Sequence, residues 1–332
     1  MKLSLAMLLL VLGSCASTRG RLDMDSIGRR DLPEVGDEIV ICGQRYSIGA
    51  PVVLWTDPDG YDAYQTDFHF GSPPRSVKKP PRVGKLRYTP GRETRSEGVT
   101  VLFPAGSNDI DALGEVVDQF VLHYDVAGLS RSCFKVLHDR RGLSVHFMLD
   151  IDGTIYQTLD LRDQAWHAAK ANPRSIGIEI ANMGAWQLSK VAELETWYSR
   201  DWKGTRIRIP AWVEESGVRT LGFVGRPARD ERIRARIQGE VREQYDFTPE
   251  QYDSLVKLTA ALCQIFPNLE PTVPRDARGR VRTTVMSDAE WRAYSGILGH
   301  LHVSKHKQDP GPAFEWESFL VRVQMRLMSS GT

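Results

Sequence analysis

Short apolar runs with the spacing of β-strands alternate with helix signals from about residue 98 to the end of the chain. Residues 121–124 and 176–180 each indicate a buried strand. Residues 145–159 indicate a hairpin that turns at Asp152-Gly153. Because strands alternate with helices rather than forming one long series, the pattern predicts an α/β domain over residues 98–328.

The helix signals in this region are capping residues followed by apolar residues at helical spacing. Residues 248–251, TPEQ, form a capping box with a first-turn proline, and the apolar period continues to Ile265. Ser130 is expected to cap a second helix that ends at Gly142. A final helix is predicted over residues 316–328.

Three other segments have a different character. Residues 33–70 contain short strand-like runs and are expected to form a small β-rich appendage. Residues 71–97 are rich in proline, lysine and arginine, which predicts an extended linker. Residues 186–245 show no sustained apolar period, and we interpret them as an insertion that either binds substrate or is a surface excursion.

The composition excludes one class of function. The chain has 332 residues, 41% of them hydrophobic, and a formal net charge of +1. A dedicated nucleic-acid-binding protein usually has a strongly basic face, so a nucleic-acid partner is not expected.

The N-terminus has the pattern of an export signal. Residues 1–14 combine one lysine, a short apolar run and small residues, as secretory signals do. The run ends in LGSC, with Leu12 three positions before Cys15, and it resembles the lipobox of bacterial lipoproteins. This resemblance implies lipidation of Cys15, a tether over residues 15–32 and an outer-membrane location facing the periplasm. An ordinary signal peptide with an incidental cysteine is the alternative.

A dense group of chemically active side chains lies near the C-terminus. Residues 299–314, GHLHVSKHKQDPGPAF, contain three histidines, two lysines and one aspartate beside a Pro-Gly-Pro turn. A catalytic zinc ion needs three protein ligands and one open position. The chain has eight histidines, and spacing alone does not select among them. On a strand, His300 and His302 would point the same way and could both bind the metal.

Five motifs resemble, in order, those of a known family. They are FVLHYD, LSVHFMLDIDGTIYQTLD, AWHA, NPRSIGIEIAN and GH followed by KQDPGPAF. Together they resemble the zinc-dependent N-acetylmuramoyl-L-alanine amidase family, the type 2 amidase fold shared with peptidoglycan recognition proteins. The resemblance extends over about residues 98–322 and is interrupted by the insertion. It implies a central mixed β-sheet flanked by helices, with one zinc ion in an open groove.

The resemblance also implies roles for individual residues. His123, His300 and Asp309 match the metal ligands, and the match favours His300 over His302 and His306. Glu179 matches the general acid/base, and Lys307 matches the catalytic lysine.

Three further residues match positions near the groove. His146, His167 and Trp166 are expected to contact substrate, with structural packing as the alternative for each.

The implied reaction is hydrolysis of the amide bond between N-acetylmuramic acid and L-alanine in peptidoglycan or its fragments. One alternative is a lipoprotein that binds peptidoglycan without cutting it. Another is a zinc amidase or peptidase that acts on a different cell-wall amide.

Overall fold

The computed structural model describes residues 36–73, 76–96 and 99–329. All of them belong to one compact unit, Pro33–Thr332. The expected signal peptide, the tether and the lipidated Cys15 lie outside the described residues.

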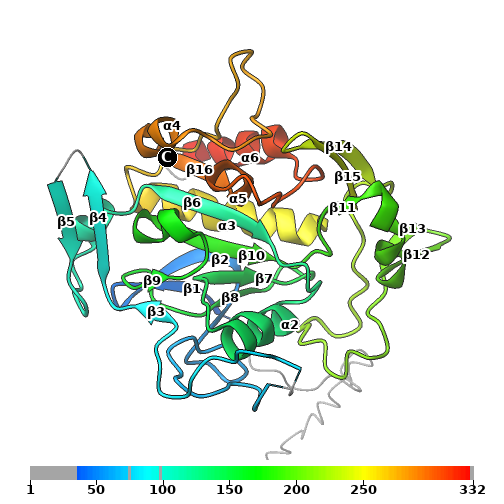
Figure 1. Cartoon of the computed structure of the whole chain (residues 1–332), viewed down its shortest axis with the longest axis horizontal. Coiled ribbons are helices and arrows are strands. Elements are labelled where there is room, and N and C mark those ends of the chain that lie inside the picture. The colour runs from blue at the N-terminus through cyan, green and yellow to red at the C-terminus, as the bar shows by residue number, and fades with distance from the viewer. Residues whose placement is uncertain (1–35, 74–75, 97–98, 330–332) are drawn as a thin grey trace, which may run out of the picture. The chain divides into compact units, whose positions relative to one another are not determined.

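A seven-stranded sheet forms the centre of this unit, in the order β1-β2-β8-β7-β10-β6-β16 (Figure 1). The β1–β2 and β7–β8 pairs are antiparallel, whereas β2–β8, β7–β10, β10–β6 and β6–β16 are parallel. The predicted central mixed sheet is therefore confirmed. Its strands are β1 Gly36–Ile41, β2 Gln44–Leu54, β6 Gln119–Tyr124, β7 Phe147–Leu149, β8 Ile155–Gln157, β10 Ser175–Ile180 and β16 Gly296–Gly299.

Helices and four two- or three-stranded sheets surround this centre. The helices are α1 Ile110–Gly114, α2 Ser130–Phe134, which continues as the π-helical η2 Lys135–Arg141, the 3-10 helices η3 Ala169–Arg174 and η4 Leu188–Thr196, α3 Pro249–Ile265, α4 Asp288–Ala293, α5 His300–Val303 and α6 Trp316–Ser329. The smaller strands are β3 Tyr88–Thr89, β4 Arg92–Ser96, β5 Val99–Phe103, β9 Gln164–Ala165, β11 Trp186–Gln187, β12 Tyr198–Asp201, β13 Gly204–Ile207, β14 Ile233–Ile237 and β15 Glu240–Gln244.

The two faces of the central sheet are covered by different helices. Alternate residues of a strand point to opposite faces. Phe147 and Leu149 accordingly join a buried cluster with residues of α3 and α6. Met148, between them, joins a second cluster with Cys133, Phe134 and other residues of α2 and η2. Both faces are buried, which explains the nearly continuous apolar sequence of these strands.

The same alternation determines where the polar residues of β6 and β10 point. Ile178 and Ile180 face α3 and α6, so Glu179 points to the opposite face. His123 is likewise directed away from that cluster, between its members Leu122 and Tyr124. Because His123 and Glu179 are register partners on adjacent parallel strands, their side chains are neighbours on one face.

Local signals predicted three of these helices, the α2–η2 helix, α3 and α6. In α3, the Thr248 side chain accepts a hydrogen bond from the Gln251 N–H, and the Gln251 side chain bonds back to Thr248, which confirms the capping box. The predicted helix that ends at Gly142 is also present, with Gly142 in the left-handed region at φ 65°. Ser130, however, is its first residue rather than its cap, since Leu129 occupies the cap position.

The small β-rich region expected at the N-terminus is present, and it joins the central sheet. Its strand β2 pairs in parallel with β8, from Val52↔Ile155 to Leu54↔Gln157. Residues 36–54 are therefore the edge of the central sheet. The pairing partner lies about 100 residues further along the chain, so no local pattern could reveal it.

The expectation of a linker over residues 71–97 was wrong for its second half. Arg87 and Arg92 are both only 1% exposed. The Arg92 guanidinium donates hydrogen bonds to the carbonyl oxygens of Leu161, Asp163 and Ser175, among others. A buried guanidinium is stable only when its N–H groups are paired, and these backbone oxygens provide the pairs.

The segment interpreted as an insertion, residues 186–245, forms small sheets. β11, β15 and β14 make a three-stranded antiparallel sheet, and β12 pairs with β13. Leu194, Trp197 and Tyr198 are buried within it.

Two observations concern the unit as a whole. The described cysteines, Cys42, Cys133 and Cys263, are free thiols. Among the described helices, none has the length and apolar character needed to cross a bilayer.

We predict that Arg92→Met destabilises the protein by about 3 kcal/mol, because it removes the donors of several buried carbonyl oxygens. Urea unfolding followed by circular dichroism measures the change. Arg278→Met, at an exposed arginine, is the matched control and should change stability by less than about 0.5 kcal/mol. Equal effects of the two substitutions would show that Arg92 is not a structural donor.

Candidate metal centre and active site

Two histidines meet because they lie at the ends of adjacent parallel strands. His123 is near the end of β6, and His300 is the first residue of α5, directly after β16. β16 pairs in parallel with β6, with Gly299 opposite Leu122. The carboxyl ends of both strands therefore lie at the same edge of the sheet. The two imidazole centroids are 4.5 Å apart.

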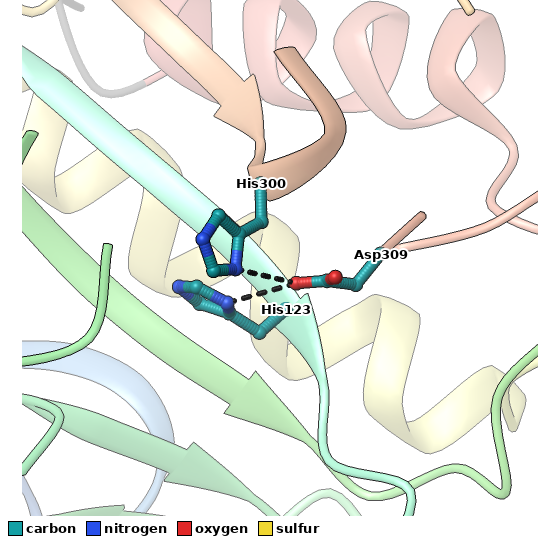
Figure 2. Close-up of side chains that lie close together, drawn as sticks. All are labelled: His123, His300 and Asp309. Carbon is teal, nitrogen blue, oxygen red and sulfur yellow. Dashed lines mark hydrogen bonds and ion pairs between the residues drawn. The ribbon is translucent and has the colours of Figure 1, made fainter. Parts of the chain in front are cut away.

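A carboxylate from the following loop joins the two rings. Asp309 Oδ2 lies 2.9 Å from His123 Nδ1 and 3.1 Å from His300 Nδ1 (Figure 2). The loop returns to α5 because the Leu301 N–H donates to the Asp309 carbonyl. Gly299 permits this close approach, since a Cβ there would lie 2.6 Å from Pro310 Cδ. This contact is a physical reason for a glycine before His300.

The three side chains have the properties of a metal site. His123, His300 and Asp309 are 2%, 5% and 6% exposed, and their candidate ligand atoms lie within 4.8 Å of one another. Burial, with the nearby His300 second, lowers the pKa of His123 to about 4, which keeps its imidazole neutral. Burial would raise the pKa of Asp309, but His300 and His123 outweigh it and keep the pKa below its usual range.

This donor set fits a bound cation. Neutral imidazole nitrogen and carboxylate oxygen are ligands that zinc takes, and three protein ligands leave one position open. The two Nδ1 atoms both face one carboxylate oxygen. A metal ion at this point would satisfy all three lone pairs, so the residues can hold one.

Glu179 provides a carboxylate beside the metal site. Its side chain is partly exposed, whereas its Oε2 atom is shielded and has no hydrogen-bond partner among the described residues. Burial raises the pKa of Glu179 well above its ordinary value, and the charges of Asp309 and Asp125 raise it further. Lys307 and Arg141 oppose this shift. An unpaired carboxylate whose pKa is raised in this way holds a proton more readily than an exposed glutamate does, which suits a group that accepts and releases protons.

Lys307 and Glu179 line one pocket with the three metal-site residues, and its volume is about 250 Å³. Lys307 is fixed through its backbone. The Gln238 amide donates to the carbonyl oxygens of Leu301, Ser304 and Lys307 at 2.7 to 3.2 Å. Gln238 belongs to the segment interpreted as an insertion, which therefore supports the loop that carries Lys307.

Sequence reasoning missed two charged residues of the pocket, Asp125 and Arg141. Asp125 Oδ1 accepts hydrogen bonds from the backbone N–H groups of Ala127, Gly128 and Asn182, while Oδ2 is buried without a partner among the described residues. Burial raises the pKa of Asp125 to about 7. The sequence signal that could have identified Asp125 was its position two residues after His123.

The structure directs His302 away from the metal site, whereas His306 lines the same pocket without being one of the three clustered ligands. His300 and His302 lie in a helix rather than on a strand, so their side chains point in different directions. His302 Nδ1 accepts the Gly299 N–H at 2.9 Å, and its Nε2 donates to the Arg282 carbonyl at 2.8 Å. His306 is exposed and lies at the pocket.

The three residues expected to contact substrate lie in different surroundings. Trp166 lines the pocket, and its indole N–H donates to Thr89 Oγ1 at 2.9 Å. His167 also lines the pocket, and its Nδ1 lies 3.0 Å from His123 Nε2. His146 is fully buried, and its Nδ1 accepts the Gly177 N–H at 3.1 Å. It therefore offers a substrate no surface in this structure.

We predict that Glu179→Gln stabilises the metal-free protein at pH 8. The pKa of Glu179 is higher in the folded state than its ordinary value of 4.5. Below pH 4.5 the free energy of unfolding therefore keeps the full contribution of this group, and this contribution is lost as the pH rises toward the folded-state pKa. Glutamine does not ionise, so Glu179→Gln removes this loss of stability, which is at most about 1.4 kcal/mol per pH unit. Urea unfolding in chelator from pH 4 to 8 measures it.

The matched control is Glu193→Gln, at an exposed glutamate. It should change the free energy of unfolding by less than about 0.5 kcal/mol. If the difference in free energy of unfolding between Glu179→Gln and wild type does not grow above pH 4.5, the pKa of Glu179 is not raised.

The solved structures that are similar to this chain include the following three. A selenomethionine derivative of AmpD is 18% identical, with a TM-score of 0.31, and the match covers 63% of this chain and 86% of that one. The endolysin LysCS from Clostridium intestinale URNW is 16% identical, with a TM-score of 0.33 and coverages of 64% and 86%.

The third is the N-acetylmuramyl-L-alanine amidase AmiD from E. coli, in complex with the substrate anhydro-N-acetylmuramic acid-L-Ala-D-gamma-Glu-L-Lys. It is 17% identical, with a TM-score of 0.35, and the match covers 69% of this chain and 65% of that one.

Sequence comparison identifies the family directly. No curated protein is significantly similar to the chain. The family described as N-acetylmuramoyl-L-alanine amidase (Amidase_2) matches residues 113–312, which is 200 of the 332 residues. The match includes His123, Glu179, His300, Lys307 and Asp309. The chain therefore belongs to the N-acetylmuramoyl-L-alanine amidase family of peptidoglycan hydrolases.

Proposed function

We propose that this enzyme uses one zinc ion, held by His123, His300 and Asp309, to hydrolyse the amide bond between N-acetylmuramic acid and L-alanine in peptidoglycan or its fragments. The observation that carries the proposal is the convergence of these three buried ligands beside the unpaired carboxylate of Glu179 in one pocket. When bound, zinc polarises a carbonyl group and lowers the pKa of water toward about 7.

Glu179 is the proton-transfer group in this proposal. It is the register partner of His123 on the adjacent strand, so its carboxylate lies next to the metal site. Its Oε2 has no competing partner among the described residues. Glu179 takes a proton from the attacking water and delivers it to the nitrogen of the departing L-alanine, the two tasks of a hydrolytic acid/base.

Lys307 supplies positive charge at the reacting carbonyl. Its side chain lines the pocket, and the three hydrogen bonds from Gln238 hold the loop that carries it. A positioned donor at the carbonyl oxygen stabilises the negative charge that develops there, typically by about 3 kcal/mol. Lys307 thus acts at the carbonyl oxygen of the amide, and Glu179 acts at its nitrogen.

Trp166 provides an aromatic surface for the glycan or peptide part of the substrate. It lines the pocket, and its indole N–H is held by Thr89. AmiD carries an anhydro-muropeptide in its structure, and muropeptides of this class are the substrates that we propose for this chain.

We also propose that the enzyme is exported and anchored by a lipid on Cys15 to the outer membrane, facing the periplasm. The support is the apolar run and the LGSC sequence at the N-terminus. Such an anchor would place the pocket in the compartment that contains its substrate.

The proposed reaction can be tested with purified sacculi and with muropeptides of defined structure. We predict free peptides that begin with L-alanine, identified by mass spectrometry. Glu179→Ala should reduce the rate by about 10²- to 10⁴-fold, because the proton-transfer group is removed. Peptides released by cleavage at another amide, or an undiminished rate in Glu179→Ala, would refute the proposed reaction.

Metal content tests the ligand set separately. We predict about one zinc per chain in the wild type, measured by plasma mass spectrometry, and loss of most of it in His300→Ala. His306→Ala is the matched control, because it removes an exposed histidine of the same loop, and it should retain the metal. Zinc retained in His300→Ala but lost in His306→Ala would overturn the assignment.

A further inference from the structure

The imidazole of His167 connects a proposed metal ligand to the strand β10. His167 Nδ1 lies 3.0 Å from His123 Nε2, and His167 Nε2 lies 3.2 Å from the hydroxyl of Ser175. Both ring nitrogens of His167 therefore have partners within the chain. No ring nitrogen remains to donate a hydrogen bond to a substrate or to accept one from it.

The metal-binding role of His123 determines the direction of these hydrogen bonds. A neutral imidazole has one N–H and one lone pair. His123 Nδ1 faces Asp309 Oδ2, so a metal bound there takes the Nδ1 lone pair and leaves the proton on Nε2. His123 Nε2–H then donates to His167 Nδ1, and His167 Nε2–H donates to Ser175 Oγ.

We infer that His167 is a positioning residue, which fixes the tautomer and ring orientation of His123 for metal binding, and that Ser175 and Gly177 hold His167 in place. This inference rests on the proposed metal-dependent function. Metal-binding histidines usually donate their second N–H to a partner in the protein, and loss of that partner weakens metal affinity by about 10- to 100-fold.

Gly177 makes room for the His167 ring. A Cβ at this position would lie 2.4 Å from His167 Nδ1 and 2.5 Å from its Cε1. Gly177 lies within β10 and has no positive φ, so its backbone would accept alanine. The glycine is therefore required by the approach of the imidazole, as glycine in a strand often is when another group packs closely.

Hydrogen bonds also hold the backbone of His167. Asn172 Oδ1 accepts hydrogen bonds from the N–H groups of His167 at 3.1 Å and Ala168 at 2.6 Å. The buried Arg92 donates to the carbonyl oxygens of Asn172 and Ser175 at 3.4 and 2.9 Å. The segment once expected to be a linker thus supports the residue that orients His123.

The first test compares two replacements of His167. Asparagine places an oxygen near the position of Nδ1 and can still accept the His123 N–H, whereas leucine cannot. We expect His167→Leu to weaken zinc binding by about 10- to 100-fold in chelator competition, and His167→Asn to recover most of it. The visible spectrum of the cobalt-substituted protein should change in His167→Leu and resemble wild type in His167→Asn.

The matched control is His69→Leu, a half-buried histidine whose Nδ1 bonds to Gln65. It should leave the zinc dissociation constant and the cobalt spectrum unchanged. Circular dichroism and urea unfolding of each variant show whether it is folded, and only folded variants are compared.

A second test leaves His167 intact. Gly177→Ala should displace the imidazole and weaken zinc binding as His167→Leu does. In a His167→Ala background there is no ring to displace, so adding Gly177→Ala should weaken zinc binding no further. This double-mutant cycle separates the steric role of Gly177 from a general effect on the strand.

The outcomes distinguish the inference from the proposed function. Tight zinc binding by the wild type, with an unchanged dissociation constant and cobalt spectrum in both His167→Leu and Gly177→Ala, would overturn the positioning role and leave the function standing. A wild-type protein that binds no zinc would overturn the metal-dependent function and this inference with it.

Discussion

One carboxylate oxygen shared by two buried imidazoles is the interaction on which the active site depends. Asp309 Oδ2 lies about 3 Å from both His123 Nδ1 and His300 Nδ1. The three groups converge on one point in a buried site, and together they are a donor set that zinc takes. The same burial lowers the pKa of His123 and so keeps its ring neutral, as a metal ligand must be. The arrangement is therefore suited to a metal ion.

The central sheet creates this arrangement and explains why the remaining groups lie where they do. β10, β6 and β16 are adjacent and parallel, so their carboxyl ends present Glu179, His123 and His300 at one edge. Each strand packs apolar side chains against α3 and α6. The side chains that alternate with them therefore point to the opposite face. A shift of one residue in β6 or β10 would turn His123 or Glu179 into the core.

Local patterns were sufficient to predict the α/β class, the capping box at Thr248 and the buried strand that carries Glu179. They failed where a partner lies far away in the sequence. The pairing of β2 with β8 made residues 36–54 part of the sheet. The burial of Arg92 depends on backbone carbonyl oxygens, which every sequence contains. The motifs suggested a role for His167 at the groove, but its two ring contacts could be seen only in three dimensions.

The central claim is that one metal ion binds between His123, His300 and Asp309, and anomalous diffraction at the zinc absorption edge tests it most directly. The account predicts a single strong peak about 2.0 to 2.2 Å from His123 Nδ1, His300 Nδ1 and an Asp309 carboxylate oxygen. A peak bound by His302 instead of His300, or no peak at this edge of the sheet in zinc-loaded crystals, would contradict it.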